Sequence, residues 1–162
     1  MTWLISDANI IIDMEAGAIL DKMFRLPETF AVPNVLYVEE LEKHHPHLPG
    51  LGLRVLTVEE EYMQEAYRLG GVYRKPGFND LLALSLAKQQ RCPLLTGDGK
   101  LREAAEMEQV EVRGTLWLME RMFASKILGL EAVQEAYEKM DNDGRRLPWP
   151  EVRGQLKKMG RD

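Results

Sequence analysis

Short apolar runs alternate along this chain with longer stretches in which apolar residues recur every three or four positions. The short runs predict buried strands, and the longer stretches predict helices with one apolar face. Strands are expected at residues 3–5, 29–32, 53–58, 92–95 and 110–112. Helices are expected at residues 14–24, 33–44, 59–69, from Asp80 onward, 101–107, from 115 to a break at 128–129, 130–140, and after Pro150. This alternation is typical of an α/β domain with a mainly parallel, roughly five-stranded central sheet.

Turn-forming residues mark the expected ends of several elements. Residues 45–50 contain two prolines and a glycine, so a loop is expected there. The pair Gly70-Gly71 is expected to end the helix that begins at Glu59. Asn79 is expected to cap the helix that follows it.

The composition is that of one soluble globular domain. With 162 residues, 45% of them hydrophobic and 29% charged, the chain can bury a core without disulfides. Residues 1–142 are assigned to the domain and residues 143–162 to a C-terminal helical extension of it. No apolar run is long enough to cross a bilayer and the first residues lack a basic leader, so a cytoplasmic protein without membrane contact is expected. Cys92 is the only cysteine, which excludes an internal disulfide.

Four acidic residues lie where an apolar pattern begins or stops: Asp7, Glu40, Asp80 and Asp98. Active sites of parallel α/β sheets lie off the carboxyl ends of the strands, where Asp7 and Asp98 are expected. Glu40 and Asp80 are expected on helices that can reach the same edge. Four carboxylates in one place need protons or a cation, and the cations that prefer oxygen ligands are Mg²⁺ and Mn²⁺. The pattern therefore indicates a metal-dependent phosphodiester enzyme.

The formal net charge of −5 narrows the ways in which the chain can bind nucleic acid. Proteins that bind nucleic acid by bulk electrostatics usually carry a basic face. A nuclease remains compatible with this charge, because two divalent ions would offset the charge of the four carboxylates.

The order of these motifs resembles that of the PIN domain, a family of metal-dependent nucleases. Ser6-Asp7-Ala8-Asn9 is similar to the family's first motif, and Glu40-Leu41 to its second, with Glu39 as the alternative. The helix opened by Asp80 is similar to the third motif, and the turn Leu95-Thr96-Gly97-Asp98 to the fourth. The resemblance runs from Leu4 to about Glu120 and implies a PIN-like three-layer α/β/α domain.

The resemblance also implies a chemistry and a set of site residues. Asp7, Glu40, Asp80 and Asp98 would hold Mg²⁺ or Mn²⁺, which activates a water for hydrolysis of a phosphodiester. Asn9 and Thr96 would orient these carboxylates or their waters. The residues expected to contact substrate phosphate are Lys100, Arg102, Arg74 and Lys75. The family often has a Ser three residues before the third acid, and this chain has Gly77 there.

The family includes the toxins of many prokaryotic toxin–antitoxin pairs, so the resemblance implies an endoribonuclease with an RNA substrate, an antitoxin partner and a homodimeric state. One alternative is a non-catalytic interaction module on a PIN scaffold, for which a degraded acidic cluster would be expected. The other is a phosphatase with an aspartyl nucleophile. That chemistry usually needs a second Asp two residues after the first, where this chain has Asn9.

Overall fold

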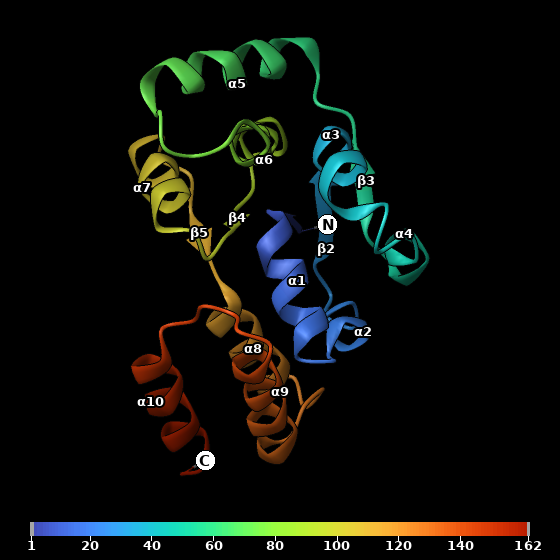
Figure 1. The fold of residues 1–162 in the computed structure, drawn as a ribbon, viewed down its shortest axis with the longest axis vertical. Helices are drawn as coiled ribbons and strands as arrows, with labels where there is room; N and C mark the ends of the chain where they lie inside the picture. The colour runs from blue at the N-terminus through green and yellow to red at the C-terminus, as the bar shows by residue number, and fades with distance from the viewer. Residues whose placement is uncertain (1, 162) are drawn as a thin grey trace.

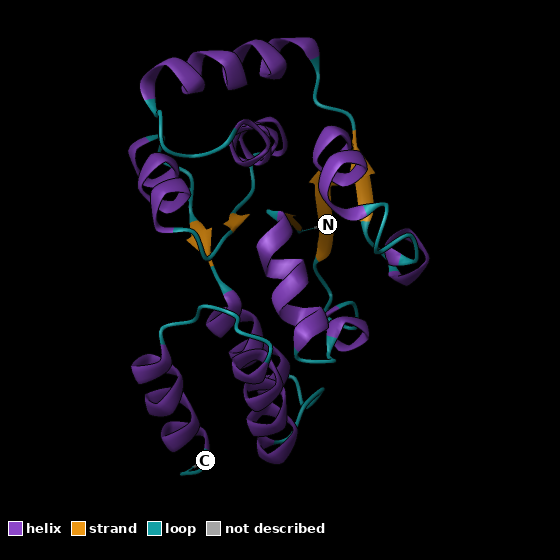
Figure 2. Ribbon diagram, in the orientation of Figure 1, coloured by secondary structure: helices purple, strands orange, loops and turns teal. Residues whose placement is uncertain are grey.

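The computed structural model describes residues 2–161, which form a five-stranded sheet between two layers of helices (Figures 1 and 2). Its strands follow the order β3-β2-β1-β4-β5, and every neighbouring pair is parallel. The strands are β1 (Trp3–Ser6), β2 (Thr29–Pro33), β3 (Arg54–Leu56), β4 (Leu94–Leu95) and β5 (Val112–Arg113). The predicted α/β fold class is therefore confirmed.

Helices cover both faces of the sheet. They are α1 (Ala8–Ala16), α2 (Leu20–Met23), α3 (Asn34–Leu36), the π-helical turn η1 (Tyr37–Leu41), α4 (Leu48–Leu51), α5 (Glu60–Val72), α6 (Phe78–Gln90), α7 (Gly99–Met107), α8 (Thr115–Ala124), α9 (Leu130–Asn142) and α10 (Trp149–Met159). Figure 1 shows α5 and α6 stacked at the top of the view, α1 in the middle beside β2, and α8 and α9 below. The helix α1 packs on both α8 and α9.

The core is built around α6, which lies between the sheet and α5. All residues from Leu81 to Ala87 are buried, so this helix is enclosed on every side. On the other face of the sheet, α1 buries Ile10, Ile11 and Met14. Because both faces are covered, the strands contribute residues such as Leu4 and Ile5 that have no exposed surface.

The first helix begins earlier than predicted. It was expected over residues 14–24, but α1 begins at Ala8 because the side chain of Asp7 accepts a hydrogen bond from the N–H of Ile10 and caps the helix. The chain then turns at Ala18, which has a positive φ of 58°, and a separate short helix, α2, follows. The prediction missed the cap because Asp7 was assigned only a site role.

The expected end at Gly70-Gly71 is also wrong, since α5 continues to Val72. Each glycine costs about 1 kcal/mol in a helix interior relative to alanine. The packing of α5 along α6 outweighs that preference. The helix ends at Tyr73, which adopts an extended conformation.

Other boundaries shifted for similarly local reasons. Gly77, not Asn79, caps α6, and the side chain of Asn79 instead donates a hydrogen bond to Glu39 at 2.8 Å. The expected loop at 45–50 contains the start of α4, where Pro49 lies in the first turn and needs no hydrogen-bond donor. The last helix, α10, likewise begins at Trp149, before Pro150. The strands β3, β4 and β5 are short, and β5 includes Arg113.

The C-terminal segment packs on the rest of the fold. The hydroxyl of Tyr137 in α9 donates to Gln155 in α10, and the amide of Gln155 donates to the carbonyl of Leu116 at 2.8 Å. Within residues 2–161, every helix is too short or too polar to span a membrane.

Candidate active site

Asp7 lies directly after β1, at the carboxyl edge of the sheet. Its N–H donates to the carbonyl of Leu95 at 3.1 Å, which fixes it beside the end of β4. One carboxylate oxygen caps α1, and the other accepts a 2.6 Å hydrogen bond from the hydroxyl of Thr96. Burial above all, together with the negative charges of Asp80 and Asp13, raises the pKa of Asp7 from 3.8 to about 7, although its hydrogen bonds from Thr96 and Ile10 act in the opposite direction.

Asp98 follows β4 and is joined to Asp7 through Thr96. The N–H of Asp98 donates to the Thr96 hydroxyl at 3.0 Å, and that hydroxyl donates to Asp7. One carboxylate oxygen of Asp98 caps α7 by accepting from the N–H groups of Lys100 and Leu101. Thr96 is completely buried and contacts both acids, which is the placement expected for a residue that orients them.

Asp80 lies in the first turn of α6. Its negative charge interacts with those of the three other predicted acids. Burial, followed by the charges of Asp98 and Glu40, raises its pKa. Asp80 also raises the pKa of Asp7. The structure therefore brings all four acids into one electrostatically connected group.

Glu39 and Glu40 lie in the π-helical turn η1, where the N–H of Glu42 donates to the carbonyl of Tyr37 at 2.8 Å. A hydrogen bond that spans five residues inserts one extra residue into the turn, and such turns are frequent at functional sites. The negative charge of Glu40 contributes to the raised pKa of Asp80, while Glu39 accepts the hydrogen bond from Asn79. The two residues that the sequence left as alternatives therefore have different surroundings, and both lie near the start of α6.

The donor set of these acids fits a hard divalent cation, because carboxylate oxygens are the ligands that such ions prefer. Burial, with a further contribution from neighbouring negative charges, raises the pKa values of Asp7 and Asp80 at this edge. The four carboxylates do not form a finished cage, since no three His, Cys, Asp or Glu side chains within residues 2–161 are close enough together to hold one ion. Ligation by all four would need the exposed Glu40 side chain or the half-buried Asp80 side chain to move, or water to bridge.

A fifth acid, Asp13, was missed by the sequence analysis. It is only 5% exposed and lies on α1, where Thr115 donates to one carboxylate oxygen at 2.9 Å and Arg145 donates to the other at 2.7 Å. The signal for it was an acid inside the apolar run Ile10-Ile11-Ile12-Asp13-Met14.

Asn9 borders the same cavity as Asp98, one of the predicted acids, and also contacts the C-terminal segment. Its side-chain oxygen lies 3.4 Å from a guanidinium nitrogen of Arg145. Asn9, Asp13, Asp98 and Arg145 border one cavity of about 350 Å³ beside the acidic group. Asn9 therefore belongs to the wall of the site and contacts the C-terminal segment.

The four predicted phosphate-contacting residues fall on two sides of the N-terminus of α7. Arg74, Lys75 and Lys100 border a small cavity of about 180 Å³. Arg102 borders a larger cavity of about 650 Å³ together with Arg113, Arg146 and others. Asp98 caps α7, the helix whose first residues include both Lys100 and Arg102.

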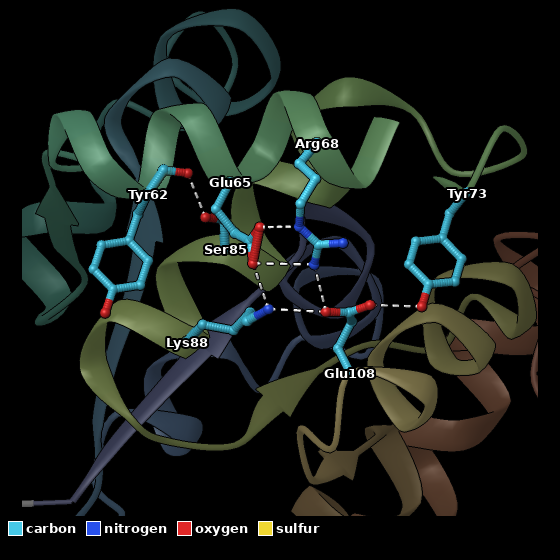
Figure 3. Close-up of polar contacts among 7 residues, drawn as sticks. All are labelled: Tyr62, Glu65, Arg68, Tyr73, Ser85, Lys88 and Glu108. Atoms are coloured by element: carbon cyan, nitrogen blue, oxygen red, sulfur yellow. Dashed lines mark hydrogen bonds and ion pairs between the residues drawn. The ribbon is translucent and has the colours of Figure 1, made fainter. Parts of the chain in front are cut away.

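A network of charged side chains holds the segment that carries Arg74 and Lys75 (Figure 3). Glu108 accepts hydrogen bonds from Tyr73 at 2.7 Å, from Arg68 at 2.8 Å and from Lys88 at 2.9 Å. The same lysine and arginine also bind Glu65, and the hydrogen bond from Arg68, above all, lowers the pKa of Glu65 to about 2. The network ties the ends of α5, α6 and α7 together at the start of this basic segment.

A parallel α/β sheet with acids gathered at its carboxyl edge is the architecture expected of a PIN-type nuclease domain. The PIN-domain family model DUF3368 matches residues 3–161, so the chain belongs to the PIN-domain family. The matched range includes most of the segment 143–162 that was predicted as an extension. PIN domains are generally nucleases and typically use divalent metal ions. No curated protein matches the chain in sequence.

Proposed function

We propose that this protein is a Mg²⁺- or Mn²⁺-dependent endoribonuclease in which Asp7, Glu40, Asp80 and Asp98 hold the metal. The observation that carries the proposal is that Asp7 and Asp98, from separate elements, are joined through the buried Thr96 hydroxyl at the carboxyl edge of the sheet. Burial and neighbouring negative charge raise the pKa values of Asp7 and of Asp80 beside them. An interaction module would have no need to retain this crowded negative charge, which costs folding free energy.

The bound ion would lower the pKa of a water and stabilise charge on the cleaved phosphodiester. Thr96 keeps Asp7 oriented through its 2.6 Å hydrogen bond, and Asp98 is held by its cap on α7. Lys100 and Arg102, from the first turns of the same helix, would bind phosphate oxygens on either side of Asp98. RNA as the substrate, an antitoxin partner and a homodimer follow from the family resemblance and are part of this proposal.

The test is cleavage of a labelled single-stranded RNA, and of DNA of the same sequence, with Mn²⁺, Mg²⁺ or EDTA. Asp98→Asn should abolish cleavage and leave the fold intact, because Asn caps helices about as well as Asp. The matched control is Asp21→Asn, which makes the same change at an exposed position on α2. No cleavage with either metal, or equal cleavage by Asp98→Asn, would refute the proposal.

A second pair of variants tests the register of the π-helical turn. Glu40→Gln should reduce cleavage by about a hundredfold or more, because a charged ligand is lost. Glu39→Gln should leave cleavage nearly unchanged, since its amide oxygen can still accept the hydrogen bond from Asn79. The reverse result would assign the ligand to Glu39. Gel filtration with light scattering tests the dimer, and co-purification with a neighbouring gene product tests the antitoxin.

A further inference from the structure

A cavity lies next to the acidic group, between the end of the sheet and the C-terminal helix. It has a volume of about 650 Å³, within the range of pockets that bind small organic molecules. Its wall includes Thr96 and Gly97, which directly precede Asp98. Gly97 and Arg146 also border the cavity that contains Asp98 and Asp13. A Cβ at Gly97 would meet no atom within 4 Å, so the backbone between the two cavities is open on this side.

The lining carries an excess of positive charge in a chain that is negative overall. Arg102, Arg113 and Arg146 line it, and among its described lining residues Glu151 is the sole carboxylate. Arg113 forms an ion pair with Glu111 at 3.1 Å. No ion pair within residues 2–161 involves Arg102 or Arg146, so their charges are available to a ligand.

The backbone brings two of these arginines to the cavity. A nitrogen of the Arg102 guanidinium lies 3.7 Å from the position of a Cβ at Gly114, so Arg102 extends across the N-terminus of α8. That helix end has no side-chain cap, because its N-cap residue is Gly114. Arg146 follows Arg145, whose 2.7 Å bond to Asp13 anchors the segment. Guanidinium groups beside an uncapped helix end form a favourable site for phosphate.

The rest of the wall suits a flat apolar group. The guanidinium of Arg113 lies 4.5 Å from the centre of the Trp117 ring, and Leu116, Leu147 and Pro148 complete the surface. Unpaired bases stack on aromatic rings and on the planes of arginine side chains. Glu151 adds an acceptor that suits the exocyclic amino group of cytosine or adenine.

We propose that this cavity binds one nucleotide of the substrate strand next to the scissile phosphodiester, with its phosphate on Arg102 and Arg146 and its base on the Arg113–Trp117 surface. The proposal rests on the nuclease function above and adds a binding subsite to it. The base in this subsite would be one with an exocyclic amino group, because Glu151 accepts its hydrogen bond.

Binding can be measured without catalysis, by calorimetric titration of the whole protein in EDTA with adenosine, cytidine and uridine 5′-monophosphates and with ribose 5-phosphate. The adenosine and cytidine nucleotides should bind more tightly than the uridine nucleotide, and all three more tightly than ribose 5-phosphate. Arg146→Ala should weaken nucleotide binding by about tenfold or more, because a charge-assisted contact is lost. Arg153→Ala, an exposed position on α10 outside this lining, is the matched control and should have no effect.

If ribose 5-phosphate binds as tightly as the nucleotides, the base-binding surface is refuted. If Arg146→Ala binds nucleotides as tightly as the wild type, the proposed subsite is refuted. Glu151→Gln should abolish the preference for the amino-bearing bases, and an unchanged preference would refute the role of Glu151. The two proposals fail separately. Asp98→Asn should abolish cleavage and keep nucleotide binding. If the wild type cleaves RNA but binds no nucleotide, the proposed nuclease function stands and this subsite is excluded.

Discussion

Replacing Asp7 with Asn should stabilise the protein at pH 8 when divalent ions are absent. Asp7 has no exposed surface, and burial raises its pKa to about 7. Its negative charge therefore lowers the stability of the folded state at any pH where the carboxylate is ionised. Asn has nearly the same shape and can still accept the hydrogen bond from the N–H of Ile10, but it carries no charge.

The magnitude follows from the linkage between proton binding and folding. Below pH 3.8 the carboxyl of Asp7 is protonated in both states, and stability then falls as the pH rises through the interval from 3.8 to about 7. Above that interval the loss is constant, at about 4 kcal/mol for a shift of roughly three units. Asn would recover only part of this, because its NH₂ group would face the Thr96 hydroxyl, and realigning that hydroxyl costs about 1 to 2 kcal/mol. A net gain of about 2 kcal/mol is expected at pH 8.

Urea unfolding in EDTA at pH 5 and pH 8 measures this difference. The advantage of Asp7→Asn should largely disappear at pH 5, where most of the folded wild type has a neutral Asp7. Between pH 5 and pH 8 the contribution of Glu65 to stability should stay constant. Its pKa is lowered to about 2, so this contribution is already complete above pH 5. Asp21→Asn serves as the control with no pH-dependent difference. A wild type that is as stable as the variant at pH 8, or a difference equal at both pH values, would refute the reasoning.

Arg145→Ala should lower the free energy of unfolding by about 3 kcal/mol, because the buried carboxylate of Asp13 loses its charged partner. The loss should shrink in an Asp13→Asn background, and additive losses in the double variant would contradict this. Tyr73→Phe should lower the unfolding temperature by about 3 °C, since the hydroxyl no longer donates to Glu108; calorimetry with an unchanged transition would argue against a stabilising role. Mn²⁺ should raise the unfolding temperature of the wild type, and a rise of equal size in Asp98→Asn would place the ion elsewhere.

The sequence alone was sufficient for the fold class and for the positions of Asp7 and Asp98 at strand ends. Both depend on short apolar runs and on the residues that directly follow them. Parallel strands align their carboxyl ends, so two acids that each follow a strand come together without further information. Element ends were less predictable. The cap of α1 is a local hydrogen bond to Asp7, whereas the continuation of α5 through two glycines depends on its packing against α6.

Three features were decided only by the tertiary structure. The π-helical turn Tyr37–Leu41 sets the surroundings of two acids, so that Glu39 accepts a hydrogen bond from Asn79 while the charge of Glu40 contributes to the raised pKa of Asp80. The ion pair of Asp13 with Arg145 joins residues 132 positions apart, and it places Arg146 beside the acidic edge. Residue patterns record which face of an element is apolar. Which distant side chains meet is determined by how the elements pack, and for that reason the acids were visible in the sequence while most of their surroundings were not.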